Sequence, residues 1–187
     1  MLDCKEYSII LVGSAALPAT IEILEDKGEE LRKRYSKRYL DEAYARLIEY
    51  RKIQEASAKA FFVGNALGVS SMCSLDDDKI QSEPYLIRCG LDGVFGALYR
   101  LGDMLKTGLR AKLFDIPIDQ VTIELCDYVD INPYEADAGG AFIIASDSHG
   151  RMLDELNEKG IPAKLIGYTT RDNSRIVLGP TERYLTK

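Results

Sequence analysis

The sequence predicts an α/β protein in which a mixed β-sheet packs against helices as a two-layer sandwich. Short apolar, β-branched runs, such as those at 9–12 and 141–146, alternate along the chain with segments whose apolar residues recur at helical spacing. The chain has 187 residues, of which 46% are hydrophobic and 29% are charged, and this is typical of one soluble domain with its own core. We therefore expect residues 1–187 to form a single α/β domain.

The first half begins with a strand and continues with two helices. Residues 9–12 form a buried strand that Gly13 ends, and apolar residues then recur at helical spacing from 18 to 35. Asp41 is the expected N-cap of a second helix that runs to about residue 62. Beyond this helix we expect a short strand at 69–73 and an exposed, inserted loop at 76–88.

The second half alternates helices and strands more regularly. Gly108 stands just after a predicted helix, where glycine commonly ends one, and Pro133 stops the helix that Pro117 begins. In chain order we expect a helix at 91–106, a strand at 109–116, a helix from Pro117, a strand at 141–146, a helix at 150–159 capped by Asp147, and strands at 163–170 and 175–179.

Charge and cysteine content exclude several function classes. The net charge of -6 argues against a general binder of nucleic acid or anionic membranes, since both reward an excess of Lys and Arg. The basic cluster at 32–38 is interleaved with acids and is typical of a solvated helix face. No leader and no membrane-spanning apolar run are present, so we expect a cytoplasmic protein with four free thiols, Cys4, Cys73, Cys89 and Cys126.

Metal and nucleophile sites have little support in the sequence. No CxxC pair occurs and His149 is the only histidine, so a zinc site is not predicted. The acids at 76–78 have the ligand chemistry of magnesium, although consecutive acids in a loop are more typical of a solvated surface. Cys73 and Cys89 would be nucleophiles only if a neighbouring base lowered the pKa of the thiol.

The stretch "CGLDGVFGALYRLG" at 89–102 is the main candidate for a site. Gly90 and Gly93 precede a helix, so their turn could cradle a phosphate, with Arg88 beside it and Gly139 and Gly140 in a second glycine turn. The alternative is close packing of the helix against a sheet. Packing is favoured because Asp92 places a negative charge at the helix start, where it would repel phosphate.

Several pieces of the chain together resemble a known family. "GVFGALYRLGDMLKTGLRAKLFDIPI", "LCDYVDINPYEADAGGAFIIAS", "GIPAKLIGYTT" and "RIVLGPTERYLT" are similar, in order and spacing, to the C-terminal domain of the aminoimidazole-ribonucleotide (AIR) synthase superfamily, above all to its hydrogenase-maturation branch. The resemblance implies enzymes in which ATP activates an oxygen atom by phosphoryl transfer. A preceding domain carries most ATP and magnesium ligands in that family, and we expect it to be absent here.

The pieces that would touch substrate depart from the family. Residues 88–93 lack the family's Asp and Thr, or alternatively "GVSSMCS" starts the motif and places Cys73 and Ser74 where His and Asp are usual. Asp137 and Ala138 replace the usual hydroxyl residues, and the C-terminal cysteine of the maturation branch is missing. We therefore predict a stand-alone module, non-catalytic by itself, that binds a ligand or protein.

The alternative is one half of a split ATP-dependent enzyme, completed by a separate nucleotide-binding partner. No cofactor is predicted for the isolated chain, and ATP with magnesium is implied only together with such a partner. Under the first hypothesis a homo-oligomer is expected. Under both, the candidate anion or nucleotide contacts are Arg88, Gly90, Gly93, Gly139 and Gly140.

Overall fold

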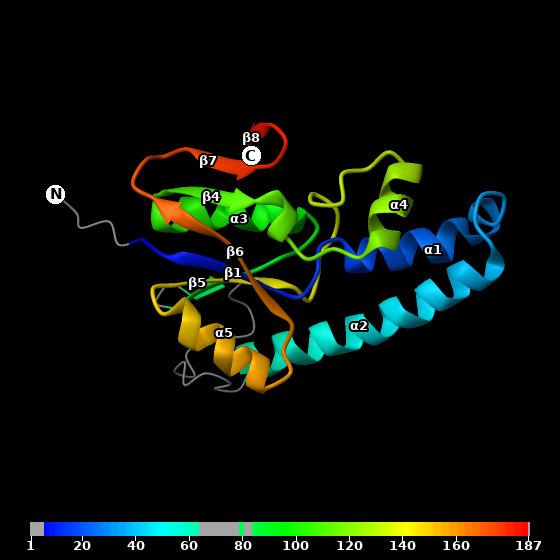
Figure 1. The fold of residues 1–187 in the computed structure, drawn as a ribbon, viewed down its shortest axis with the longest axis horizontal. Coiled ribbons are helices and arrows are strands. Elements are labelled where there is room, and N and C mark those ends of the chain that lie inside the picture. The colour runs from blue at the N-terminus through cyan, green and yellow to red at the C-terminus, as the bar shows by residue number, and fades with distance from the viewer. Residues whose placement is uncertain (1–5, 64–78, 81–83, 187) are drawn as a thin grey trace.

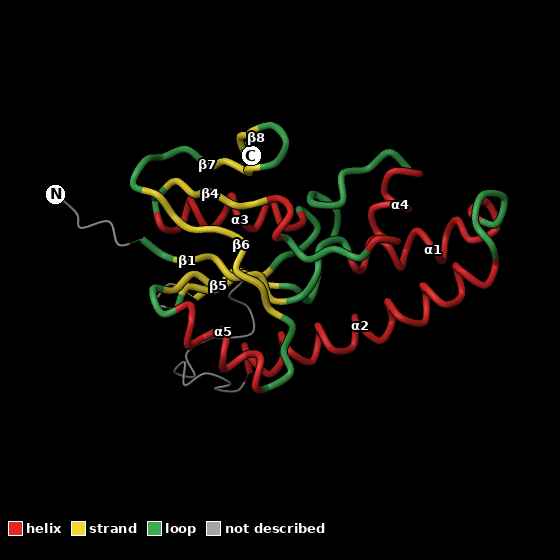
Figure 2. The backbone as a smooth tube through the Cα atoms, viewed as in Figure 1, coloured by secondary structure: helices red, strands yellow, loops and turns green. Residues whose placement is uncertain are grey.

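A computed structural model describes residues 6–63, 79–80 and 84–186, and its centre is one mixed β-sheet (Figures 1 and 2). The eight strands lie in the order β2-β3-β5-β1-β6-β4-β7-β8. The predicted α/β class with a mixed sheet is confirmed. The strands are β1 Ser8–Val12, β2 Lys79–Ile80, β3 Tyr85–Arg88, β4 Gly108–Lys112, β5 Phe142–Ser146, β6 Ala163–Thr170, β7 Arg175–Leu178 and β8 Glu182–Tyr184.

Strand β1 lies at the centre, between β5 and β6, and is antiparallel to both. At one end of the sheet Val12 is opposite Phe142, which is in turn opposite Arg88 of β3. The parallel pair is β4 with β7, and it makes the sheet mixed. The strand ends that lead to Gly13 and to Cys89 therefore lie together at one edge of the sheet, beside the start of β5.

Helices cover both faces of the central strands. The helices are α1 Leu17–Leu31, α2 Lys37–Val63, α3 Gly93–Leu105, α4 Gln120–Tyr128 and α5 His149–Glu158, with a 3-10 helix at Leu113–Asp115. Ile9 and Leu11 of β1 pack in the cluster with α3, whereas Ile10 and Val12 pack with α5 and the end of α2. The two-layer arrangement predicted from the sequence thus has an additional helical layer over the sheet centre, and Figure 1 shows α3 and α5 on opposite sides.

The helices α1, α2 and α4 form an arm beside the sheet with a core of its own (Figure 1). Leu31, Leu47 and Leu125, one from each helix, are fully buried in this core. The arm explains the helical spacing of apolar residues from Leu17 to Leu47, because most of these residues pack in the core of the arm. Within the described residues, no helix is both long and apolar enough to cross a membrane.

Several predicted boundaries are wrong for identifiable reasons. Helix α2 begins before Asp41, because the Ser36 hydroxyl accepts the Tyr39 amide at 3.2 Å and so caps the helix earlier. Helix α3 ends at Lys106, whose φ of 52° is left-handed, and Gly108 instead begins β4. The N-cap of α5 is Ser148 instead of Asp147.

The segment predicted as an inserted loop ends in a strand. Tyr85–Arg88 forms β3, in which Leu86 and Ile87 are buried, and it pairs with β5. Strand β8 was not predicted, because all three of its residues are exposed and give no apolar alternation. The strand expected at 69–73 lies outside the described residues.

Candidate functional site

The Gly90–Gly93 turn lies at the start of α3, and the backbone of residues 134–136 packs directly against it. Gly93 has a φ of +67°, and its N–H donates to the Gly90 carbonyl at 2.9 Å. A Cβ atom on Gly93 would lie 2.8 Å from the Ala136 carbonyl oxygen and closer still to that of Tyr134. Glycine is therefore required at this position by the backbone conformation and by packing, with no ligand needed.

Amides at the start of α3 bond to carbonyls of the chain itself. The Phe95 N–H donates to the Tyr134 carbonyl at 3.0 Å, and the Gly96 N–H donates to the Asp92 carbonyl at 3.0 Å. A phosphate at a helix start needs such amides to be free, since they supply the hydrogen bonds that hold it. The Gly93 and Phe95 amides therefore already donate to backbone carbonyls of the chain, and they are not free to bind an anion.

The structure brings the two predicted glycine turns together. The Cys89 N–H donates to the Ala141 carbonyl at 2.9 Å, and the Ala138 N–H donates to the Gly90 carbonyl at 3.1 Å. Gly139 and Gly140 lie between these two contacts. Gly140 has a φ of +86°, so this turn also depends on glycine.

Arg88 is the last residue of β3, next to this junction. Its carbonyl oxygen accepts a hydrogen bond from Nη2 of Arg100 at 2.7 Å, and Arg100 also forms an ion pair with Asp92. Arg100 thus connects the end of β3 with the start of α3. Its charge is neutralised by Asp92, which offsets part of the positive charge that a nucleotide site would use.

Gln54 of α2 links the junction to the end of β1, and sequence reasoning missed it. The side chain is only 3% exposed; its Oε1 accepts the Ser14 amide at 2.8 Å, and its Nε2 donates to the Gly139 carbonyl at 3.0 Å. A Cβ atom on Gly13 would lie 2.5 Å from Oε1 of Gln54. No local pattern in the sequence distinguishes this glutamine from a solvent-exposed one.

A groove of about 800 Å³, which we call the α3 groove, runs over the exposed face of α3 beside the C-terminal strand β8. Arginines and acids alternate in it: Arg100 pairs with Asp92, and Arg183 pairs with Glu135. At its border, Nη2 of Arg175 lies 2.7 Å from Oδ1 of Asp103. The residues lining the groove are Asp92, Phe95, Gly96, Tyr99, Arg100, Asp103, Glu135, Arg183, Tyr184, Leu185 and Thr186.

Aromatic rings lie under these arginines. The guanidinium of Arg175 lies 4.4 Å from the centre of the Tyr99 ring, and that of Arg183 lies 5.4 Å from the centre of the Phe95 ring. Such cation–π contacts attract each guanidinium to the face of a ring. Arginine and tyrosine are the residue types enriched where proteins bind one another, so the composition of the α3 groove favours a protein contact.

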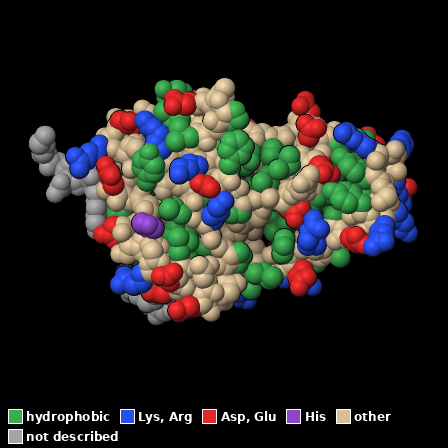
Figure 3. Space-filling view, in the orientation of Figure 1, with side chains coloured by type: hydrophobic (Ala, Val, Ile, Leu, Met, Phe, Trp, Pro, Cys, Tyr) green, Lys and Arg blue, Asp and Glu red, His purple; other side chains and the backbone are tan. Residues whose placement is uncertain are grey.

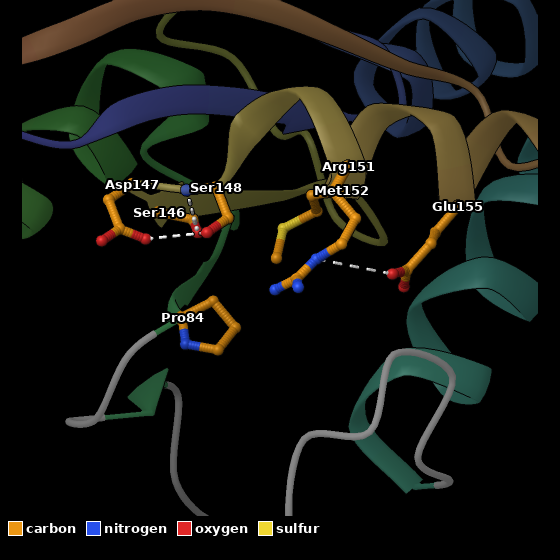
Figure 4. Close-up of a pocket in the computed structure, with 7 residues that line it drawn as sticks. All are labelled: Pro84, Ser146, Asp147, Ser148, Arg151, Met152 and Glu155. Carbon is orange, nitrogen blue, oxygen red and sulfur yellow. Dashed lines mark hydrogen bonds and ion pairs between the residues drawn. The ribbon is translucent and has the colours of Figure 1, made fainter.

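A smaller pocket of about 290 Å³ lies at the start of α5, near the end of β5 (Figure 4). Its polar side chains bond to one another or to nearby backbone: the Ser148 hydroxyl donates to Asp147 at 2.9 Å, and the Ser146 hydroxyl accepts the Ser148 amide at 3.1 Å. Arg151 lies 3.9 Å from Glu155. These contacts therefore join neighbours along the chain at 146–148 and successive turns of α5.

The described cysteines are buried and unreactive in this environment. Burial raises the pKa of the Cys89 thiol to about 12, although Arg100 acts in the opposite direction, and burial raises that of Cys126 to about 11. At neutral pH both are thiols, so neither is suited to be a nucleophile. The cysteines at 4 and 73 and the acids at 76–78 lie outside the described residues.

Metal ligands do not gather in the part of the chain that the structure describes. Groups of three or more His, Cys, Asp or Glu side chains that could hold an ion are not found there. Asp92, Asp103 and Glu135 are each paired with an arginine. Asp137, in the junction itself, accepts the Gly139 amide at 2.9 Å.

Comparison with solved structures identifies the fold. Similar structures include hydrogenase maturation protein HypE of E. coli (TM-score 0.60, 13% identity, 96% of this chain and 49% of that chain) and a HypE in complex with ATP (TM-score 0.60, 12% identity, 96% and 50%). Thiamine-monophosphate kinase from Stenotrophomonas maltophilia K279a is also similar (TM-score 0.55, 13% identity, 92% and 50%). No family model and no curated protein sequence matches the chain.

These likenesses define the class of protein. The chain has the AIR synthase-like fold that its sequence resemblance implied, and it spans about half the length of each of these structures. That half-length match is consistent with a fragment like the family's C-terminal domain. Identities of 12–13% show the fold alone, because one fold supports many functions.

Proposed function

We propose that this chain is not a catalyst by itself and acts as a binding module that pairs with a second copy through the α3 groove. The observation that carries the proposal is the alternation of arginines and carboxylates, interleaved with aromatic rings, along one face of the molecule. The occupied amides of Gly93 and Phe95 support the non-catalytic part, since they leave no cradle for a phosphate at those amides.

A second copy suits this groove because the groove is complementary to itself. In a two-fold interface the same surface meets itself, so every contact of a basic group with an acidic group of the other copy is made twice. The α3 groove contains Asp92, Asp103 and Glu135 beside Arg100 and Arg183, with Arg175 at its border. Exchange of these ion pairs between two copies would keep every charge neutralised while burying the exposed ring of Tyr184 and the partly exposed ring of Tyr99.

Sedimentation velocity at micromolar concentration tests this pairing. We expect the natural chain to sediment as a dimer and Arg183→Glu to sediment as a monomer, because the substitution sets two acids against each other at Glu135. Arg151→Glu is the matched control, since Arg151 also lies beside a glutamate, Glu155, but on α5 and away from the groove. A natural chain that stays monomeric, or the same shift in both variants, would contradict the proposal.

The second candidate function is one half of a split ATP-dependent enzyme. The similar HypE structure in complex with ATP, together with the half-length match, favours it. In that case Arg88, Gly90, Gly93, Gly139 and Gly140 would contact the nucleotide, and a partner chain would supply the magnesium ligands. Calorimetric titration of the chain with ATP and magnesium separates this function from the first, because only the split enzyme is expected to bind the nucleotide.

A further inference from the structure

Another cavity, of about 460 Å³, lies between the sheet and the helical arm, and we call it the arm pocket. The Gly13–Ser14 turn after β1, helix α2, and the loops at 117–119 and 160–162 surround it. Figure 3 shows hydrophobic side chains gathered where the arm meets the sheet, around a hollow in this face. Its volume is in the range of small-molecule sites, which are about 300–1,000 Å³.

The sides of the arm pocket are apolar and partly open to solvent. Tyr50 and Ile53 lie one helical turn apart on α2, and they are 48% and 40% exposed. The apolar lining is completed by Leu17, Pro117, Ile118 and Pro162. Exposed apolar residues that line a concave surface are more informative than isolated ones, because burying them releases water.

The base of the pocket is polar and fixed in place. Ser14 uses its amide for Gln54, and its hydroxyl donates to the Pro117 carbonyl at 3.1 Å. A hydroxyl that has donated its proton still has lone pairs, so the Ser14 oxygen remains able to accept a hydrogen bond. Gln54 is held at both ends of its amide, and the pocket is therefore formed before any ligand enters.

The charge of the lining restricts the ligand further. The described lining contains no Lys or Arg, and Asp119 is its one carboxylate. Asp119 accepts hydrogen bonds from Nη2 of Arg46 at 2.9 Å and from the Val121 amide at 2.9 Å. An anionic ligand would meet a carboxylate and no free cation, whereas a ligand N–H would find acceptors in Ser14 and Asp119.

We propose that the arm pocket binds a small aromatic molecule that is neutral or basic and carries an N–H donor. Its ring would pack against Tyr50 and Ile53, and its donor would reach the Ser14 hydroxyl oxygen at the base. The proposal is independent of the pairing through the α3 groove, because the two sites share no lining residue.

A charge series on one ring system tests the proposal. Indole, tryptamine and indole-3-propionate would each be added at about 1 mM to the natural chain, and their binding would be compared by saturation-transfer difference NMR. This concentration is high enough to detect weak, fragment-sized ligands. We expect saturation transfer to indole and tryptamine, and at least about tenfold weaker binding of the propionate, equal to about 1.4 kcal/mol.

Two substitutions at exposed isoleucines locate the binding. Ile53→Glu places a charge in the pocket, and Ile123→Glu is the matched control, because Ile123 is 48% exposed on α4 and does not line the pocket. Tyr50→Ala removes the ring without adding charge, and circular dichroism melting shows that each variant is folded. We expect loss of binding of the neutral indole in Ile53→Glu, weaker indole binding in Tyr50→Ala, and neither change in Ile123→Glu.

Three results would overturn the proposal. The first is the absence of saturation transfer to indole and tryptamine. The second is equal transfer to indole in the natural chain and in Ile53→Glu. The third is binding of indole-3-propionate as strong as that of tryptamine.

Discussion

The Gly90–Gly93 turn and the arm pocket lie at the same edge of the sheet, and Gln54 contacts the surroundings of both. They differ in what fills them. The turn is rich in glycine, and the chain's own carbonyls from 134–136 occupy it. The arm pocket has no sequence motif, and it is open to solvent. Glycines before a helix thus indicate that another group approaches the backbone closely. In some proteins that group is a ligand, and in this one it is the backbone of the chain itself.

The largest expected effect concerns Gly93. Gly93→Ala should lower the free energy of unfolding by about 2–4 kcal/mol, because the residue has a positive φ and its Cβ would overlap the carbonyls of Tyr134 and Ala136. Urea denaturation measures this effect. Gly28→Ala is the control, since a Cβ there meets nothing within 4 Å and the change should stabilise α1 by roughly 0.5–1 kcal/mol. Full stability of Gly93→Ala would show that packing does not explain this glycine.

A smaller effect is expected at Gln54, which joins the two regions. Gln54→Ala should destabilise the protein by about 1–3 kcal/mol, because the partly buried Ser14 amide and Gly139 carbonyl lose their partner and the buried side chain of Gln54 is removed. Gln120→Ala removes a glutamine that bonds only to an exposed glutamate, Glu124, and should change stability by less than about 0.5 kcal/mol. Equal losses in the two variants would mean that Gln54 does not fix the base of the arm pocket.

At the border of the arm pocket, Asp119 caps helix α4. Asp119→Ala should cost about 0.5–2 kcal/mol, because the Val121 amide loses its acceptor at 2.9 Å. Asp119→Asn keeps the cap and should cost less than the alanine variant in thermal unfolding. An asparagine variant as unstable as the alanine variant would assign the effect to the ion pair with Arg46 instead.

The smallest expected effect is the extent to which a thiol reagent modifies the two buried cysteines of the folded chain. In a chain carrying Cys4→Ser and Cys73→Ser, neither Cys89 nor Cys126 should react with Ellman's reagent at pH 8, and both should react in urea. The pKa of the Cys89 thiol is about 12 in the folded chain, above its usual value of 9.0, because burial disfavours the thiolate. Cys89 therefore contributes to the free energy of unfolding below pH 9, and this contribution is lost as pH rises from 9 to 12. Rapid reaction of Cys89 in the folded chain would contradict its burial.

Most of the fold could be predicted because its elements follow local rules. The apolar run of β1 and most of the helical spacing from 18 to 47 reflect burial in the sheet and in the core of the arm. The errors occur where the deciding feature is polar or exposed and so gives no apolar pattern. Ser36 takes the cap from Asp41, and the exposed strand β8 forms by pairing with β7.

The candidate sites could be predicted only in part. Gly90, Gly93, Gly139 and Gly140 were identified together from the sequence, and the structure brings their turns together. What occupies them could not be predicted, because it depends on the path of residues 134–136. Gln54 gave no signal, since its role comes from a contact with Gly139, 85 residues further along the chain.

We propose that the Gly90–Gly93 turn serves packing and does not cradle a nucleotide in the isolated chain. Isothermal titration calorimetry of the purified chain with ATP and with ADP, each with magnesium, tests this proposal. We expect no binding at millimolar nucleotide from a folded chain. A magnesium-dependent dissociation constant in the micromolar range, lost in a Gly93→Asp variant that remains folded, would contradict the account and favour the split enzyme.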